Sequence, residues 1–315
     1  MAFESQFIEA NGQKLHVKTL GGGGGDGGDG GGDDAQKPLV LMLHGFPEYW
    51  AAWAPVAEAL LRNTGGSYRF ALPDQRGYNL TSIPAEREAY DTKHLVADME
   101  ALIDQLAPNQ KIILCGHDWG ASVAYAMAMR HPDRVSHLII ANGVHPICFQ
   151  KALFAAGPQT AASQYMNVLR SENVEDRLSA NGFEKLLGML EKFSSAPWLD
   201  DATKDAYRAA WSPPGALTAM LNWYRQSPMV VPATDTPAQD LPITDAMRQK
   251  YAVTMPHLLL WGLQDTALLP EARADLGTFC DDLSVLEHQD ASHWILHEQP
   301  DWVAEQISAF LSAKS

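Results

Sequence analysis

Residues 111–132 read KIILCGHDWGASVAYAMAMRHP and decide how the rest of the chain is interpreted. The apolar run 111–115 predicts a buried strand, and the residues 121–130 predict a helix. Between them lies GHDWG, residues 116–120, the G-x-Nuc-x-G pattern of a nucleophile elbow. The two glycines permit a sharp turn, which lifts the middle side chain into a pocket and points the N-terminus of the helix at it.

The middle residue of this elbow is Asp118. A carboxylate cannot act as a serine hydroxyl does, but it can attack an electrophilic carbon and form an ester. The alternative interpretation is an Asp that only caps a helix after an unrelated strand–helix turn. The motifs in the rest of the chain favour the interpretation of Asp118 as a nucleophile.

An acid and a histidine follow the elbow, each just after a predicted strand. The run 257–261 leads to Asp265, and His293 lies between the last predicted strand and the C-terminal helix. Nucleophile, acid and base therefore occur in the chain order that this type of elbow predicts, at strand ends where α/β sheets gather their active sites. Asn142 follows an earlier strand but has no carboxylate, which leaves Asp265 as the acid.

The run PLVLMLHG, residues 38–45, predicts another strand buried on both faces. The turn after it can aim the N–H of Phe46 toward the elbow. Together with the N–H of Trp119, the residue after Asp118, it would form an oxyanion hole. A simple strand exit is the alternative.

Apolar runs alternate with helical stretches along most of the chain, which favours an α/β fold with a mostly parallel central sheet flanked by helices. We expect most strands to be buried between helical layers. Further strands are expected at 68–72, 111–115, 135–141, 257–261 and 283–287, helices at 53–62, 92–106, 121–130 and 302–313, and a hairpin with Asn11-Gly12 between 7–10 and 13–19.

The interval 142–251 breaks this alternation, because it has helix-like stretches, prolines and aromatics but no comparable apolar run. An ordinary helical insertion explains this pattern, while the aromatics favour a helical cap over an active site. Helices are expected at 161–169, 182–193, 200–211 and 216–225. The predicted organisation is a first part of the α/β core at 1–145, a helical cap at 146–250 and a second part of the core at 251–315.

A glycine- and aspartate-rich tract, GGGGGDGGDGGGDD, occupies residues 21–34. It has almost no side chains to bury and a high backbone entropy, so a flexible surface loop is expected. Its four aspartates would repel a phosphate, which argues against an anion-binding glycine loop.

The composition excludes several other classes of protein. The 315 residues are 46% hydrophobic and 19% charged, which is typical of a globular chain with a sizeable core. The net charge of −15 disfavours nucleic-acid binding, and the three cysteines are too few for a disulfide framework or a zinc cluster. Without a membrane-spanning run or a signal peptide, we expect a cytoplasmic protein with no membrane partner.

Six motifs occur in order between residues 44 and 294: HGFPEYW, DQRGYNLTSIP, GHDWGA, LNWYRQ, WGLQD and SHW. As a set they resemble the epoxide hydrolases of the α/β-hydrolase superfamily, over nearly the whole chain except the glycine tract. The resemblance implies an α/β-hydrolase fold with an inserted cap, whose Tyr224 in LNWYRQ and Tyr165 in SQYMNVLRSENVEDRL activate the epoxide oxygen. It also implies a cis Phe46–Pro47 bond. Asn79 departs from the RGYG form of the family, which puts that turn in question.

The resemblance implies an enzyme that converts a small apolar epoxide and water to a vicinal diol. Asp118 opens the ring and forms an ester, while the phenols of Tyr165 and Tyr224 hydrogen-bond to the departing oxygen. His293, oriented by Asp265, then activates the water that hydrolyses the ester. This chemistry requires no metal and no organic cofactor.

Two alternatives remain open on the sequence alone. GHDWGA also occurs in haloalkane dehalogenases, so a haloalkane or haloacid dehalogenase could use the same nucleophile; Trp119 fits a halide site, but the Phe46 side chain has no donor. A ligand-binding receptor on the same fold is the non-enzymatic alternative. We expect Phe46, Trp119, Trp223 and Trp294 to line the pocket, although packing explains Trp223 and Trp294 equally well. A homodimer and a role in detoxification are compatible with the sequence.

Overall fold

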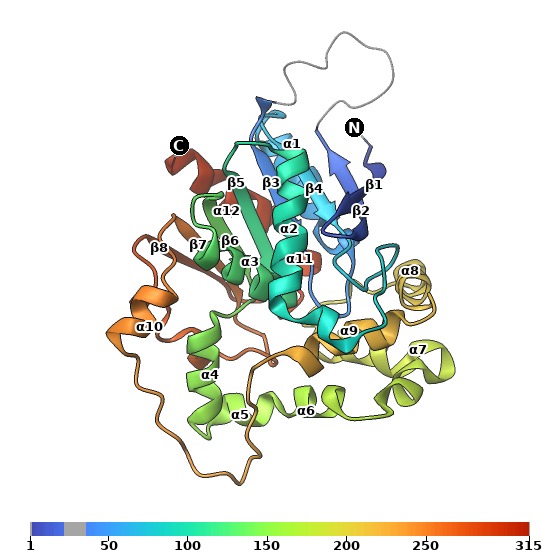
Figure 1. The fold of residues 1–315 in the computed structure, drawn as a ribbon, viewed down its shortest axis with the longest axis vertical. Helices are drawn as coiled ribbons and strands as arrows, with labels where there is room; N and C mark the ends of the chain where they lie inside the picture. The colour runs from blue at the N-terminus through green and yellow to red at the C-terminus, as the bar shows by residue number, and fades with distance from the viewer. Residues whose placement is uncertain (1, 22–35, 315) are drawn as a thin grey trace.

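The computed structural model describes residues 2–21 and 36–314, and its centre is an eight-stranded sheet (Figure 1). The strands lie in the order β1-β2-β4-β3-β5-β6-β7-β8. Their bounds are β1 Glu4–Ala10, β2 Gln13–Leu20, β3 Leu39–Leu43, β4 Arg69–Pro73, β5 Ile112–His117, β6 Val135–Ala141, β7 His257–Gly262 and β8 Leu283–His288. From β4 to β8 every neighbouring pair is parallel, while β2 is antiparallel to β1 and β4. The predicted mostly parallel sheet is confirmed.

The N-terminal hairpin forms at the predicted turn. Asn11 and Gly12 connect β1 to β2 with φ of 50° and 71°. Positive φ at both central residues is what a two-residue hairpin of this type needs, and Asn-Gly meets that need with little strain.

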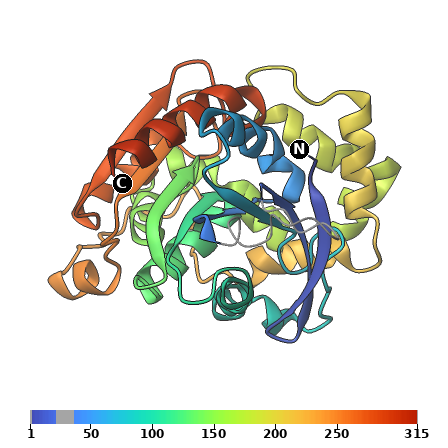
Figure 2. The ribbon, with the colours of Figure 1, turned by 90° about the horizontal axis from the view of Figure 1, so that it is seen from above.

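Helices cover both faces of the sheet. The helices outside the interval between β6 and β7 are α1 Ala54–Asn63, α2 Thr92–Leu106, α3 Trp119–Arg130, α11 Ile295–Glu298 and α12 Pro300–Ala313, with short 3-10 turns at Trp50–Trp53, Arg87–Tyr90, Pro270–Arg273 and Leu276–Thr278. Because successive side chains of a strand point to opposite faces, Val40 and Met42 pack in one core with α1 and α12, and Leu39 and Leu41 in another with α2 and α3. Figure 2 shows α1 and α12 on one side of the sheet and α2 on the other.

Seven helices occupy the chain between β6 and β7, and no residue from 142 to 251, all of which are described, lies in a strand. They are α4 Pro146–Phe154, α5 Pro158–Ala162, α6 Gln164–Arg170, α7 Val174–Lys192, α8 Asp201–Trp211, α9 Ala216–Gln226 and α10 Asp245–Lys250. In Figure 1 helices α4 to α7 and α9 lie below the sheet, where β5 leads into the elbow.

The helices of this interval differ in detail from the predicted ones. The helix expected at 161–169 is divided between α5 and α6, and α7 begins at Val174 but leaves the helical conformation from Ala180 to Phe183. Helices α4 and α10 were not predicted. Helix α10 buries none of its residues, so it has no apolar face for a sequence pattern to reveal.

Strand β8 is more exposed than predicted. None of its six residues is fully buried, and Val285 and Leu286 are 38% and 37% exposed. The reason is its position at the edge of the sheet, where β7 is its neighbour.

The departure at Asn79 leaves the local turn intact. Asn79 adopts a φ of 47°, as a glycine there could, and its Nδ2 donates to Asp74 Oδ2 at 2.7 Å. Asn tolerates the left-handed conformation better than other non-glycine residues. The Phe46–Pro47 bond is cis, as the resemblance implies.

The loop predicted at 21–34 lies outside the described residues apart from Gly21. Among the helices that are described, none combines the length and apolar character needed to cross a bilayer.

Replacing Gly120 with Ala tests how closely α3 packs on β3. A Cβ at this position would collide with the backbone carbonyl of Leu43, which cannot move as a side chain can. We expect Gly120→Ala to lower the free energy of unfolding by about 3 kcal/mol in urea denaturation. The control is Gly188→Ala in α7, where a Cβ meets nothing within 4 Å. Equal stability of the two variants would contradict the close packing.

Candidate active site

The elbow forms where β5 ends and α3 begins. Asp118 lies between them with φ 48° and ψ −118°. A positive φ at a non-glycine residue costs about 1–3 kcal/mol and is typical of functional positions. A Cβ at Gly45 would collide with the Asp118 side chain, so glycine there lets the turn after β3 approach the elbow.

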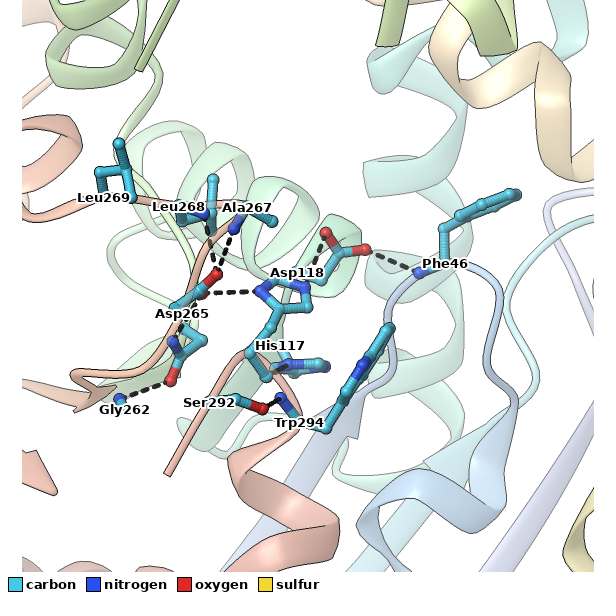
Figure 3. Close-up of polar contacts among 12 residues, drawn as sticks. Phe46, His117, Asp118, Gly262, Asp265, Ala267, Leu268, Leu269, Ser292 and Trp294 are labelled. Carbon is cyan, nitrogen blue, oxygen red and sulfur yellow. Dashed lines mark hydrogen bonds and ion pairs between the residues drawn. The ribbon is translucent and has the colours of Figure 1, made fainter. Parts of the chain in front are cut away.

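The carboxylate of Asp118 is held from two sides. Its Oδ1 accepts a hydrogen bond from the N–H of Phe46 at 2.7 Å, as Figure 3 shows, and its Oδ2 lies 3.5 Å from His293 Nε2. The side chain remains 13% exposed. Trp119 is the first residue of α3, so its N–H has no partner within the helix. One carboxylate oxygen is thus bound by a backbone donor, and the other faces an imidazole.

The imidazole is oriented by Asp265. Nδ1 of His293 donates to Asp265 Oδ2 at 2.8 Å, and Asp265 Oδ1 accepts the N–H groups of Ala267 at 2.8 Å and Leu268 at 2.9 Å. Burial would raise the pKa of Asp265, but the charge of His293 and these hydrogen bonds outweigh it and hold that pKa below its ordinary value. The acid is therefore ionised at neutral pH.

Two carboxylates act on His293 in opposition to its burial. Burial lowers the pKa of His293, whereas the charge of Asp265 and the hydrogen bond that Asp118 accepts raise it, and the outcome is a pKa of about 10. At neutral pH the ring therefore carries a proton on each nitrogen.

Asn142, which sequence reasoning set aside because it lacks a carboxylate, holds the acid in place. It is fully buried at the end of β6, its Nδ2 donates to Asp265 Oδ2 at 2.7 Å, and its Oδ1 accepts the N–H of Gly262 at 2.9 Å. One amide therefore joins the end of β7 to the side chain of Asp265. Its position directly after a predicted strand was the only signal in the sequence.

Glu48 and His117 form a buried pair that sequence reasoning also missed. His117 Nδ1 lies 2.9 Å from Glu48 Oε2, and its Nε2 lies 2.8 Å from the backbone carbonyl of His293. Burial would raise the pKa of Glu48, but the hydrogen bonds from His117 and from His297 hold it well below its ordinary value. The carboxylate of Glu48 and the carbonyl of His293 thus hold the His117 ring between the turn after β3 and the loop of His293.

The two predicted tyrosines come from different helices of the interval and meet at the cavity that contains Asp118. Tyr165 lies on α6 and Tyr224 on α9, and their ring centroids are 6.4 Å apart. Burial raises the pKa of both phenols above the ordinary value, and the charge of Asp118 raises it further. Both phenols are therefore protonated at neutral pH and able to donate.

The cavity has a volume of about 630 Å³. Asp118, Trp119 and the two tyrosines line one part of it. The rest of its wall is mainly apolar, with Met129, Val144, Ile147, Phe149, Met166 and Leu268 among the lining residues, and it also includes the charged Asp91, Arg130 and Lys250. A second, small cavity of about 20 Å³ also reaches Asp118 and both tyrosines and is lined by Phe46, His293 and Trp294. A volume of this size accommodates one water molecule.

Trp223, the remaining residue predicted to line the pocket, lines neither cavity. Its ring packs against Trp119 with the centroids 6.1 Å apart, and its indole N–H donates to the carbonyl of Arg76 at 3.0 Å. Among the residues that the structure describes, no three His, Cys, Asp or Glu side chains are grouped so as to hold a metal ion.

Comparison with known proteins gives consistent matches along the chain. A family model described as alpha/beta hydrolase fold matches residues 38–300. The chain is 32% identical to the AB hydrolase superfamily protein YfhM of Bacillus subtilis over 97% of each chain, and 31% identical to epoxide hydrolase 4 of Mus musculus over 89% of this chain and 74% of that one. A solved structure described among novel epoxide hydrolases of the alpha/beta hydrolases superfamily, from metagenomes of hot environments, is 31% identical, with a TM-score of 0.81 and 99% of each chain covered.

Replacing Asp118 with Asn tests the electrostatic origin of the His293 pKa. A neutral amide 3.5 Å from Nε2 removes one of the two charges that favour the protonated ring. We expect Asp118→Asn to lower the pKa of His293, followed by NMR of its imidazole protons, by about 1–3 units. Glu305→Gln removes an exposed charge from α12 and should leave this pKa unchanged. An unchanged pKa in Asp118→Asn would mean that Asp118 does not act on the ring.

Proposed function

The chain belongs to the α/β-hydrolase superfamily, and from this membership we propose that it is an epoxide hydrolase, which converts an epoxide and water to a vicinal diol through an ester on Asp118. Relatives that carry the name epoxide hydrolase support the reaction class. One observation carries the mechanism: the Asp118 carboxylate lies at a cavity between an imidazole on one side and two protonated phenols on another.

In the first step, Asp118 attacks a ring carbon of the epoxide. Oδ1 is engaged by the N–H of Phe46, so Oδ2 is the oxygen that forms the bond to carbon. The C–O bond of the ring breaks, and its electron pair stays on the epoxide oxygen. An alkoxide is a poor leaving group, so a hydrogen bond from Tyr165 or Tyr224 stabilises that oxygen as it departs and supplies its proton. The product of this step is a hydroxyalkyl ester of Asp118.

In the second step, water hydrolyses the ester. Ester formation removes the negative charge from Asp118, and with it part of the interaction that keeps His293 protonated. The proton is then released more readily and returns to the tyrosine that gave up its own. The neutral imidazole, oriented by Asp265, accepts a proton from a water molecule whose oxygen attacks the ester carbonyl. The small cavity beside His293 has room for this water. The N–H groups of Phe46 and Trp119 stabilise the oxyanion that forms on the ester carbonyl. When this intermediate collapses, the bond between the acyl carbon of Asp118 and the diol oxygen breaks, the departing oxygen takes the proton from His293, and the Asp118 carboxylate is restored.

We assign residues 146–250 as a cap over the α/β core formed by 1–145 and 251–315. Both tyrosines belong to this interval, whereas Asp118, His293 and Asp265 belong to the core. The cap and the core therefore each contribute residues to the wall of the cavity. The apolar wall of the cavity favours an apolar epoxide. A cytoplasmic location, a homodimer and a role in detoxification stay predictions from the sequence.

Product analysis tests this proposal against the two alternatives. The protein is incubated with styrene oxide and, separately, with a bromoalkane, and diol and bromide are measured. We expect diol from the epoxide, no bromide, and a loss of diol formation by at least about 1,000-fold in Asp118→Asn. Bromide without diol would identify a dehalogenase, and tight binding of the epoxide without either product would identify a binding protein.

A further inference from the structure

Glu298, the last residue of α11, forms a cluster of hydrogen bonds outside the groups discussed above. On one side it contacts Ser292, the residue directly before His293: Oε2 accepts the Ser292 N–H at 2.6 Å, and Oε1 accepts the Ser292 hydroxyl at 2.8 Å. Both donors of Ser292 are thus bound by the same carboxylate. Ser292 itself is only 1% exposed.

On its other side, Glu298 contacts the connection between α7 and α8, residues 193–200. Oε1 accepts the N–H of Ser195 at 2.7 Å and the N–H of Ala196 at 3.2 Å. The hydroxyl of Ser195 lies 2.9 Å from Oε2 and 2.7 Å from the carbonyl of Asp290, and donates to one of the two. A single carboxylate therefore joins the loop of His293 to a segment of the helical interval.

The residue after His293 is tied to the same interval. The indole N–H of Trp294 donates to the carbonyl of Leu190 on α7 at 2.8 Å. His293 is thus flanked by two residues that are both held, directly or through Glu298, by α7 and the segment that follows it. These contacts add to those from the core, where His117 Nε2 lies 2.8 Å from the carbonyl of His293 and the N–H of Gln264 donates to the carbonyl of Ala291.

The distance between His293 and Asp118 is one that a displacement of the His293 loop would change. His293 Nε2 lies 3.5 Å from Asp118 Oδ2, longer than the 2.7–2.9 Å that is typical of a charged hydrogen bond. Displacements of about 1 Å at a reacting group cost up to about 100-fold in rate. The Glu298 carboxylate accepts charge-assisted hydrogen bonds both from the His293 loop and from the α7–α8 connection. Such hydrogen bonds are strong, so they are suited to preventing this displacement.

We propose that Glu298 is a positioning residue: it docks the His293 loop onto the α7–α8 connection, so that the base reaches the ester on Asp118 only while this segment of the helical interval is in place. The inference rests on the proposed function. We infer that Glu298 affects the second step, the hydrolysis of the ester. Its hydrogen bonds reach the loop of His293 but do not reach Asp118 or the two tyrosines.

Glu298→Gln tests the proposal, because the substitution keeps the size of the side chain. The NH₂ group of the glutamine replaces one of the two carboxylate oxygens and therefore faces the backbone N–H of either Ser292 or Ser195. Two donors then face each other, and the hydrogen bond that Glu298 accepts there is lost. Single turnovers with styrene oxide are stopped by rapid quenching, and the ester is followed by intact mass. We expect hydrolysis of the ester to slow about tenfold or more, while its formation keeps the wild-type rate, so that the ester accumulates.

Two further variants separate positioning from general destabilisation. Glu305→Gln removes the same charge from an exposed site on α12 and should behave as the wild type. Ser292→Ala removes one donor to Glu298, and combining it with Glu298→Gln should slow ester hydrolysis no more than Glu298→Gln alone, since both act on one contact. Thermal melting of each variant records any general loss of stability.

His293→Gln, measured in the same assay, distinguishes this inference from the proposed function. Suppose that His293→Gln accumulates the ester. If Glu298→Gln then slows formation and hydrolysis of the ester equally, or slows neither step, Glu298 does not position the base and the inference is overturned. If neither the wild type nor His293→Gln forms an ester or a diol, the proposed function itself fails.

Discussion

The buried imidazole of His293 lies between two carboxylates, 2.8 Å from Asp265 and 3.5 Å from Asp118, and the rest of the site depends on this arrangement. Two negative charges oppose the burial that would otherwise favour a neutral ring, which is why the pKa of His293 rises to about 10. In the proposed mechanism, ester formation removes the charge of Asp118 and leaves that of Asp265. The same pair of interactions can thus store a proton in the resting site and release it at the stage when a base is needed.

The fold brings these groups together because several parallel strands end at one edge of the sheet. The elbow after β5, the amide of Asn142 after β6 and the acid after β7 come from three neighbouring strands. Gly45 and Gly120 let the turns approach one another at distances that a side chain would forbid. The strained φ of Asp118 is held by this close packing.

Local patterns were sufficient to predict where Asp118, Asp265 and His293 lie relative to the strands. The eight strands, the elbow and the cis Phe46–Pro47 bond agree with expectations from apolar runs, glycine spacing and the resemblance, and the structure brings Asp118, Asp265 and His293 into contact. The roles of Asn142 and Glu298 were not predictable, because they depend on hydrogen bonds to Asp265 and to Ser195, which lie 123 and 103 positions away in the chain. The break from Ala180 to Phe183 falls at Asn181-Gly182, a dipeptide that is typical of turns and adopts positive φ here, and Ser163 separates α5 from α6.

The central proposal is that a bond forms between Asp118 and the substrate. A single turnover with excess enzyme in water enriched in heavy oxygen tests it most directly, because the oxygen that enters the diol must come from either the carboxylate or the solvent. Attack by Asp118 predicts an unlabelled diol in the first turnover and one heavy oxygen in the Asp118 carboxylate, measured by mass spectrometry of the peptide that contains it. A labelled diol with an unlabelled Asp118 would show that water attacks the ring directly and would contradict the ester mechanism.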